Sequence, residues 1–279
     1  MTCIHYAVQV CDHLQSMSDP RWISSDRTLI SKKSITSLLM SIHDARLQRP
    51  EIDHHVMLFT DRCSVDLNHW LENLVRTSQG HNFHVTIQPL SHAHGKTASI
   101  RACYQWLTDH GQDLVFQVQD DYVFRRTAIT ECFDTWVQVW KESPNQTHAI
   151  LQPYNHSFLW QQTAYRQNLL TVVPSACRYW IRCFNITCSF MTSHPQFVQH
   201  WDIYEDFFVL LAAEEKLLEQ KTLNRILFDR DVLGLQPIQS LSHHLDKFED
   251  IYDSPLQLWH SIDTDLFIAS CSLENKKSR

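Results

Sequence analysis

Glycine is scarce in this sequence, with only 4 among 279 residues. Flexible glycine-rich linkers are therefore excluded, and we expect a compact fold. The two glycine-rich signatures that most often bind phosphate, GxGxxG after a first strand and GxxxxGK followed by Ser or Thr, are both absent. A diphosphate bound by this chain would need another counter-charge, such as a divalent cation held by carboxylates.

The chain also lacks an excess of basic residues and a long apolar run. It has 24 Lys and Arg against 31 Asp and Glu, a formal net charge of −7, which argues against tight nonspecific binding to nucleic acid but leaves a local basic groove open. No segment approaches the roughly 18 apolar residues of a membrane span. The first residues, MTCIHYAVQV, lack the regions of a secretory signal. We therefore expect a cytoplasmic protein.

Paired cysteine motifs are missing as well. The 9 Cys residues are odd in number and include no CxxC pair. Those in apolar surroundings are Cys3, Cys11, Cys103, Cys132, Cys183 and Cys188. This pattern predicts buried free thiols in a reducing compartment and excludes a disulfide framework.

What the sequence does contain is a regular alternation of apolar strands and amphipathic helices. The predicted strands are residues 4–10, 55–60, 83–90 and 113–119. Apolar residues recur at helical spacing between them, in 35–42, 67–75 and 100–107. This order predicts an α/β fold with a mostly parallel central sheet and helices on both faces.

Further elements follow in the second half of the chain. A segment of polar character, 12–33, separates the first strand from the first helix. After the fourth strand we expect a helix at 127–140, strands at 148–155 and 183–191, a long helix at about 196–218 and a helix at 222–229.

Acidic residues stand where three of the predicted strands end: Asp12, Asp61 and the pair Asp120 and Asp121. Ligands of parallel sheets bind beyond the carboxyl ends of the strands, so these side chains are expected to converge on one cleft. Two adjacent carboxylates are costly to bury without a compensating cation or donor. The alternatives are that the pair caps the helix near Thr127 and that the other acids form ordinary turns.

These segments resemble the GT-A-fold glycosyltransferases and are similar to glycosyltransferase family 2. The first strand ends in VCD, and the second in FTDRCSVD, where Asp61, Ser64 and Asp66 match the family's DDGSTD. Arg62 replaces the second Asp of that motif. The resemblance covers roughly residues 4–250 and implies a GT-A (Rossmann-like) sheet with a smaller acceptor-side portion.

Two later segments carry the same resemblance. QVQDDY aligns the family's DxD with Gln119, Asp120 and Asp121, so that Gln119 replaces the first Asp. PIQSLSHHL resembles the segment that presents a metal-binding His, which favours His244 over His243. The resemblance implies Mn²⁺ or Mg²⁺ as cofactor, with Asp121 and His244 as metal ligands and Asp120 either ligating the metal or contacting the sugar.

The resemblance also implies roles for residues around the nucleotide. Asp12 and Asp61 would accept hydrogen bonds from base and ribose, and Gln119 would bind the ribose because it both donates and accepts. Lys96 or Arg101, which open the third helix, would contact phosphate, or else lie on a solvated helix face. His92 and His94 are expected at the surface, without a third metal partner.

On the acceptor side the resemblance implies a general base near the start of the long helix. Glu205 and Asp206 are the candidates, and their alternative is the solvated side of an apolar helix. Aromatic and Arg side chains that could contact an acceptor, or form a Trp-rich core, are Trp160, Tyr165, Arg178, Tyr179, Trp180 and Arg182.

The function implied by the resemblance is a metal-dependent, hexosyltransferase-like glycosyltransferase that moves a sugar from a nucleotide-diphosphate sugar to a glycan or other hydroxyl acceptor. The alternatives are transfer to a modified base in DNA, a nucleotidyltransferase, and a non-catalytic nucleotide-sugar-binding module. We expect a nucleotide-sugar-binding half at 1–144, an acceptor-binding half of the same domain at 145–250, and a C-terminal extension at 251–279.

Overall fold

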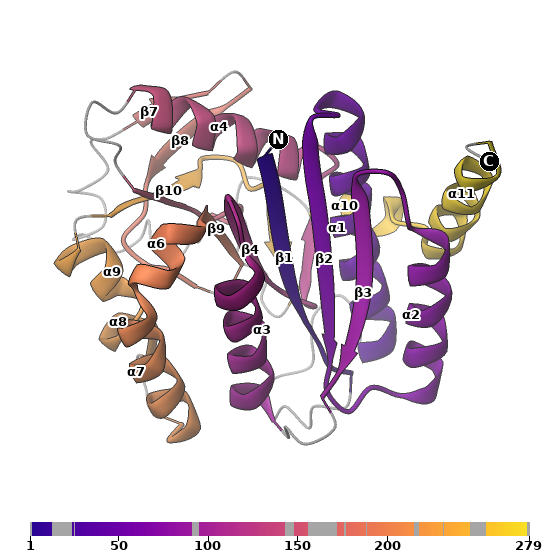
Figure 1. The fold of residues 1–279 in the computed structure, drawn as a ribbon, viewed down its shortest axis with the longest axis horizontal. Helices are drawn as coiled ribbons and strands as arrows, with labels where there is room; N and C mark the ends of the chain where they lie inside the picture. Colours follow the sequence, from indigo (N-terminus) through magenta and orange to yellow (C-terminus); the bar gives the residue numbers. More distant parts are fainter. Residues whose placement is uncertain are drawn as a thin grey trace.

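The structure is a computed structural model of the chain. It describes residues 2–12, 24, 26–90, 95–142, 148–155, 172–175, 177–187, 189–214, 218–230, 232–245 and 255–277. Figure 1 shows one large sheet that is flanked by helices on both sides.

The first four strands form the parallel part of this sheet. They are β1 (Thr2–Val10), β2 (Ile52–Thr60), β3 (Phe83–Pro89) and β4 (Leu114–Gln119). Their spatial order is β3-β2-β1-β4, and each neighbouring pair is parallel. Their carboxyl ends therefore lie together at one edge, the lower edge in Figure 1.

The second half of the chain extends the same sheet beyond β4. Its strands are β6 (Ala149–Leu151), β7 (Val172–Pro174), β8 (Tyr179–Arg182), β9 (Phe190–Ser193) and β10 (Leu233–Pro237). Within the described residues the sheet has nine strands, in the order β3-β2-β1-β4-β9-β6-β10-β8-β7. β9 is antiparallel to β4 and β6, whereas β10 is parallel to β6. The predicted α/β class with a mostly parallel central sheet is confirmed.

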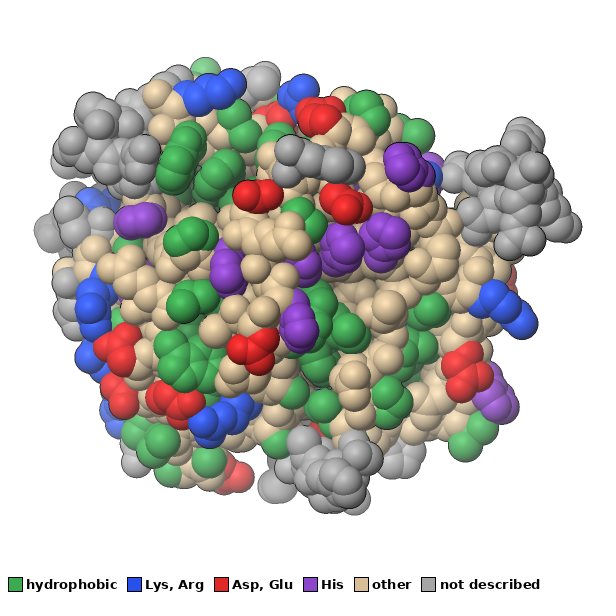
Figure 2. All heavy atoms as spheres, viewed as in Figure 1, with side chains coloured by type: hydrophobic (Ala, Val, Ile, Leu, Met, Phe, Trp, Pro, Cys, Tyr) green, Lys and Arg blue, Asp and Glu red, His purple; other side chains and the backbone are tan. Residues whose placement is uncertain are grey.

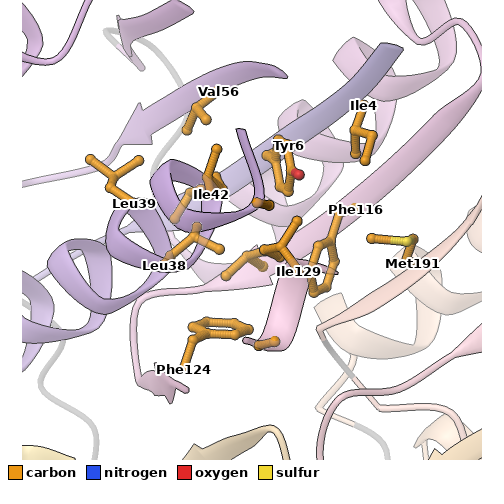
Figure 3. Close-up of a cluster of buried hydrophobic side chains, with 14 of the residues drawn as sticks. Ile4, Tyr6, Leu38, Leu39, Ile42, Val56, Phe116, Phe124, Ile129 and Met191 are labelled. Atoms are coloured by element: carbon orange, nitrogen blue, oxygen red, sulfur yellow. The ribbon is translucent and has the colours of Figure 1, made fainter. Parts of the chain in front are cut away.

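Helices cover both faces because side chains alternate along each strand. Tyr6 and Val8 of β1 point into one core, with α1 (Arg27–Gln48), α2 (Val65–Thr77), α4 (Ala128–Glu142) and α11 (Thr264–Lys277). Figure 3 shows Leu38 and Ile42 of α1 in this core beside Tyr6 and Phe116. Ala7 points into the other core, with α3 (Lys96–His110), α6 (His194–Gln199), α7 (Trp201–Ala212) and α9 (Asn224–Asp229).

The predicted boundary between the polar segment 12–33 and the first helix is wrong. The helix α1 begins earlier, at Arg27, and runs for 22 residues. The buried face of α1 includes serines at helical spacing, whose hydroxyls bond to neighbouring backbone. Ser34 Oγ donates to the Tyr122 carbonyl at 2.5 Å, and Ser37 Oγ accepts from the Phe124 N–H at 2.9 Å. Both carbonyl and N–H belong to β5 (Tyr122–Phe124), a short strand after β4. Because the first turns of this buried face include Ser31 and Ser34, apolar spacing identifies the helix only from residue 35 onwards.

Replacing Ser37 by Ala is expected to destabilise the fold by about 1–3 kcal/mol, because the buried Phe124 N–H loses its acceptor. Urea unfolding of the variant and of the unmodified protein measures this difference. The matched control is Ser270→Ala in α11, where an exposed hydroxyl bonds only to its own helix and little change is expected. Equal effects in the two variants would contradict the role of Ser37.

Two further sequence predictions are wrong. The strand expected at 183–191 lies instead at 190–193, because Gln152 and Asn224 side chains hold the backbone N–H groups of Thr187 and Ile186 at 2.8 and 2.7 Å. The long helix expected at 196–218 is divided into α6 and α7 at His200, and it ends at Ala212. Two short helices, α8 (Leu218–Lys221) and α10 (Pro255–Ser261), complete the described helices.

His200, at the α6–α7 junction, makes stability depend on pH. It is 2% exposed, and burial lowers its pKa from 6.5 to about 4, with Arg230 and His148 adding to this effect and Asp202 opposing it. At pH values between 6.5 and about 4, His200 is therefore protonated in the unfolded chain but neutral in the folded protein. Stability is therefore expected to fall as pH drops from 6.5 towards 4, by up to about 1.4 kcal/mol per pH unit from this group.

Urea unfolding at several pH values between 6.5 and 4 measures this slope. His200→Leu fills the buried position with an apolar side chain and removes the titrating group. The variant is expected to have a shallower slope than the unmodified protein. An unchanged slope would show that other groups cause the pH dependence.

Other sequence predictions concern cysteines, membranes and domain limits. The five predicted buried cysteines that the structure describes are buried, whereas Cys188 lies outside the described residues. Among the described helices, none combines the length and apolar character that crossing a membrane requires. The predicted division at 144 and 145 falls outside the described residues, so the three-part division stays a prediction.

Candidate functional site

Asp12, directly after β1, is nearly buried and joins the loop after β1 to the start of α2. Its Oδ1 accepts from the Ser64 N–H at 2.8 Å, and its Oδ2 accepts from the hydroxyls of Ser64 and Thr28. Ser64 in turn caps α2 by accepting from the Leu67 N–H. Asp12 therefore links the end of β1 to both α1 and α2.

Asp120 holds the end of β1 and the first turns of α1. Its Oδ2 accepts from the Cys11 N–H at 2.9 Å and from the Ser31 hydroxyl at 2.5 Å. Burial raises the pKa of the nearby Cys63 thiol well above its usual range, and the charges of Asp12 and Asp120 raise it further. The carboxylates of Asp12 and Asp120 therefore lie close enough to each other to act on the same thiol.

Asp61, which follows β2, is 1% exposed and positions the start of α3. Its Oδ2 accepts from the Gly95 N–H at 3.1 Å, and Gly95 adopts φ +105, which favours glycine. Arg62 lies beside the same carboxylate, with its Nε 3.3 Å from Oδ1. Lys96, the first residue of α3, is exposed at the same edge of the sheet.

Asp121 and His244 are brought together by a second, two-stranded sheet. β11 (Ser242–His244) pairs antiparallel with β5, so that His244 lies opposite Tyr122. The His244 Nε2 lies 3.3 Å from the Asp121 Oδ2, across 123 positions of sequence. The Tyr122 ring lies 4.7 Å from the His244 ring, and the Leu245 N–H donates to the Asp121 carbonyl at 2.8 Å.

Gln119, the last residue of β4, lies in a polar row across the strand ends. Its Nε2 is 3.5 Å from the Gln9 Oε1, and Gln9 Nε2 donates to Ser99 of α3 at 2.5 Å. The backbone N–H of Gln119 donates to Ser189 Oγ at 3.4 Å. Ser189 has φ 81, a left-handed conformation that costs a non-glycine residue energy. Such strain is often kept next to ligand sites.

The two candidate general bases lie on α7, which packs on the opposite face of the sheet from α1. Glu205 forms a bidentate ion pair with Arg101 at 2.6 and 2.7 Å, and Asp206 pairs with Arg225 at 2.7 Å. Within the described residues, no hydrogen bond or ion pair joins either carboxylate to Asp121 or His244. Their assignment as bases stays a prediction.

The aromatic and Arg residues of the second half divide into core and surface. Trp180 is fully buried, as the alternative of a Trp-rich core predicts, while Tyr179 is exposed. Arg178 forms an ion pair with Glu131, and Arg182 lies over the Phe184 ring at 5.2 Å. Trp160, Tyr165, His92 and His94 lie outside the described residues.

The structure brings together most of the predicted donor-side residues, and it adds hydroxyl partners that the sequence analysis missed. Thr28 and Ser31 of α1 bond to Asp12 and Asp120. The available signal was the serine spacing in SKKSITSLLMS, whose serines recur at roughly helical intervals. The side chain of Asp120 bonds to Cys11, directly after β1, and to Ser31 of α1, which the alternative of a cap for α4 does not require.

The Asp121–His244 pair suits a divalent cation by its donor chemistry. A carboxylate oxygen and an imidazole nitrogen are ligands of Mn²⁺, and carboxylate oxygens are ligands of Mg²⁺. Both side chains keep some exposure, 13% for Asp121 and 22% for His244, so that solvent or a ligand reaches them. A separation of 3.3 Å is compatible with two ligands of one ion.

No protein-family model and no curated protein sequence matches the chain. Among solved structures, a galactosyltransferase LgtC in complex with donor and acceptor sugar analogs is similar with a TM-score of 0.47 and 10% identity over 96% of both chains. The glycosyltransferase GlyE of Streptococcus pneumoniae gives 0.48 and 9% identity, covering 98% of this chain and 64% of its own.

A putative glucose-1-phosphate thymidylyltransferase from Bacillus anthracis gives a TM-score of 0.44 and 9% identity, with 94% of this chain and 97% of the other covered. Likeness at this level does not establish the activity of this chain. What the structure itself establishes is a mixed α/β fold with carboxylates just beyond the ends of β1, β2 and β4, and with Asp121 and His244 in contact.

Proposed function

We propose that this protein is a metal-dependent glycosyltransferase that uses a nucleotide-diphosphate sugar. The observation that carries the proposal is the contact between Asp121 and His244, which lie 3.3 Å apart although 123 positions separate them. These are the two residues that the family resemblance assigns to the metal.

We assign the following roles to the residues around the metal. Asp121 and His244 would hold Mn²⁺ or Mg²⁺, which when bound supplies positive charge that stabilises a leaving diphosphate. Asp120 anchors β1 and α1 through the Cys11 N–H and the Ser31 hydroxyl, and it thereby fixes the turn that carries Asp121. Asp120 would either ligate the metal as well or contact the sugar.

The nucleotide would lie along the strand ends next to this turn. Asp12 and Asp61 would accept hydrogen bonds from base and ribose, and Gln119 would bind the ribose. The amino-terminal end of α3, fixed by the Asp61–Gly95 hydrogen bond, faces the same edge and favours anions through its N–H groups. Lys96 stands at this end and would contact phosphate.

The acceptor is proposed to be a glycan or another hydroxyl compound, in a reducing, cytoplasmic compartment. A carboxylate of α7, Glu205 or Asp206, would serve as base once its Arg partner is displaced. A non-catalytic binding module is the second candidate, and one observation favours it: Asp12 and Asp120 already accept several internal hydrogen bonds. Such a module would bind the donor without turning it over.

A screen of nucleotide sugars with and without Mn²⁺ tests the proposal. A bound donor is expected to raise the melting temperature by mass action, and a glycosyltransferase is expected to release nucleoside diphosphate as well. Stabilisation without diphosphate release from any donor, with or without acceptors, would indicate the binding module. Pyrophosphate formation from a nucleoside triphosphate and a sugar phosphate would indicate a nucleotidyltransferase. If no donor binds or reacts, the proposal fails.

A further inference from the structure

A second group of metal-ligand side chains lies near the amino ends of the first strands, away from the edge described above. Cys3 of β1 and Asp53 and His55 of β2 each offer one ligand atom, and these atoms all lie within 4.8 Å of one another. Figure 2 shows histidine and acidic side chains gathered on this face of the molecule, over β2 and β3. The family resemblance assigns nothing to these residues.

The register of the sheet explains why these residues meet. In the parallel pairing of β1 with β2, Cys3 lies opposite Asp53 and His5 opposite His55. In the pairing of β2 with β3, His55 lies opposite His84. Residues two apart on a strand point to the same face, so five side chains with ligand atoms project side by side from three neighbouring strands.

The distances within this group suit a shared ion. The His55 Nε2 lies 3.1 Å from the Asp53 Oδ2, and the His84 Nε2 lies 3.7 Å from the Asp53 Oδ1. That Oδ1 atom is buried and makes no hydrogen bond to the described residues. Tetrahedral zinc sites place their ligand atoms roughly 3.5 Å apart. Small rotations of the Asp53 and His55 side chains, which are 25% and 36% exposed, would bring the three ligand atoms to that spacing.

The Cys3 thiol lies close to imidazole and carboxylate groups. Its Sγ lies 3.5 Å from the His5 Nδ1, and its backbone N–H donates to the Asp113 Oδ2 at 2.8 Å. His5 stacks on His55 with ring centroids 4.9 Å apart, which fixes both imidazoles. Zinc binds cysteine as the thiolate, so an ion bound here would displace the thiol proton.

We propose that Cys3, Asp53 and His55 bind a Zn²⁺ ion, with the neighbouring His84 as the fourth ligand. Sulfur and imidazole ligands select zinc over Mg²⁺ or Mn²⁺, which prefer oxygen. The ion links β1, β2 and β3 at their amino ends, and it stabilises the parallel sheet. His5 acts on the ion only through Cys3 and His55, whose side chains it orients.

This zinc site is independent of the proposed transferase site. The two lie at opposite ends of β1, and the eight residues from Cys3 to Val10 span roughly 23 Å. Loss of zinc would therefore lower stability without removing Asp121 or His244. The proposal stands whether or not the protein transfers sugars.

Titration of the chelator-treated, full-length protein with Co²⁺, a spectroscopic substitute for Zn²⁺, tests the site. We expect one equivalent of Co²⁺ to produce a thiolate-to-metal charge-transfer band, and Zn²⁺ to abolish that band by displacement. Cys3→Ser is expected to remove the band, whereas Cys177→Ser, which alters an exposed cysteine elsewhere, is expected to retain it. Asp121→Asn is expected to retain it too.

A second pair of measurements guards against misfolding of the Cys3 variant. His55→Gln alters a half-exposed side chain and is expected to weaken Co²⁺ binding at least about 10-fold. Zn²⁺ is expected to raise the melting temperature of the unmodified protein by about 5 °C at saturating concentration and to leave His55→Gln unchanged. Absence of the band in the unmodified protein, its persistence in Cys3→Ser, or equal Co²⁺ affinity in His55→Gln would overturn the zinc site.

Discussion

Asp121→Asn is expected to lower the metal-dependent turnover of a nucleotide sugar by at least about 100-fold. Asn keeps the size of the side chain but removes the charge that neutralises part of a divalent ion. Asp121 is the first proposed ligand from the β4–β5 turn, and it directly contacts the proposed ligand His244 at 3.3 Å. Initial rates of diphosphate release at several Mn²⁺ concentrations measure the effect.

The matched control is Asp134→Asn, which removes a carboxylate that pairs with Arg49 on the helical surface of α4, away from the strand ends. This control is expected to keep its turnover. His244→Gln is expected to raise the Mn²⁺ concentration needed for half-maximal rate more than it lowers the maximal rate, because Asp121 remains. An Asp121→Asn variant with the rate and Mn²⁺ dependence of the unmodified protein would refute the metal assignment.

The parallel half of the fold is predictable from sequence because its strands and most of its helices are long and strongly patterned. The predicted strand 113–119 matches β4 (Leu114–Gln119), and the spacing of Ile100, Cys103 and Leu107 places the buried side of α3 correctly. The second half uses strands of three to five residues, such as β6 and β10. Elements this short carry too few residues for periodicity to identify them.

The contacts of the site are predictable only in part. That Asp12, Asp61 and Asp120 share an edge follows from the parallel order of their strands. That Asp120 is held by Ser31 does not follow, because it depends on the rotation of α1 about its axis, which its serine-containing buried face leaves unspecified. The contact of Asp121 with His244 depends on β11, a strand of three residues that has no detectable pattern in the sequence. Only the family resemblance predicted that these two residues act together.

Arg178→Met is expected to destabilise the fold by about 3–5 kcal/mol. The Arg178 guanidinium binds both carboxylate oxygens of Glu131, through its Nε and its Nη2, and its Nη1 donates to the Gln239 carbonyl at 2.7 Å. Glu131 is 6% exposed, so removing Arg178 leaves a charge that water hardly reaches. Arg178 therefore joins α4 to the second half of the sheet as a structural residue. An Arg of the same type could also contact an acceptor, as the sequence analysis allowed.

The double variant Arg178→Met with Glu131→Leu removes both charges. Comparing it with Arg178→Met separates two changes in the free energy of unfolding: the loss from leaving Glu131 buried and unpaired, and the net contribution of the ion pair itself. It is expected to recover most of the lost stability, since an apolar pair of similar volume often replaces a buried ion pair without penalty. Arg230→Met breaks an exposed pair with Asp202 and is expected to change stability by less than about 1 kcal/mol. Urea unfolding of the four proteins gives these differences. If the double variant is no more stable than Arg178→Met, the buried charge of Glu131 is not the cause of the loss.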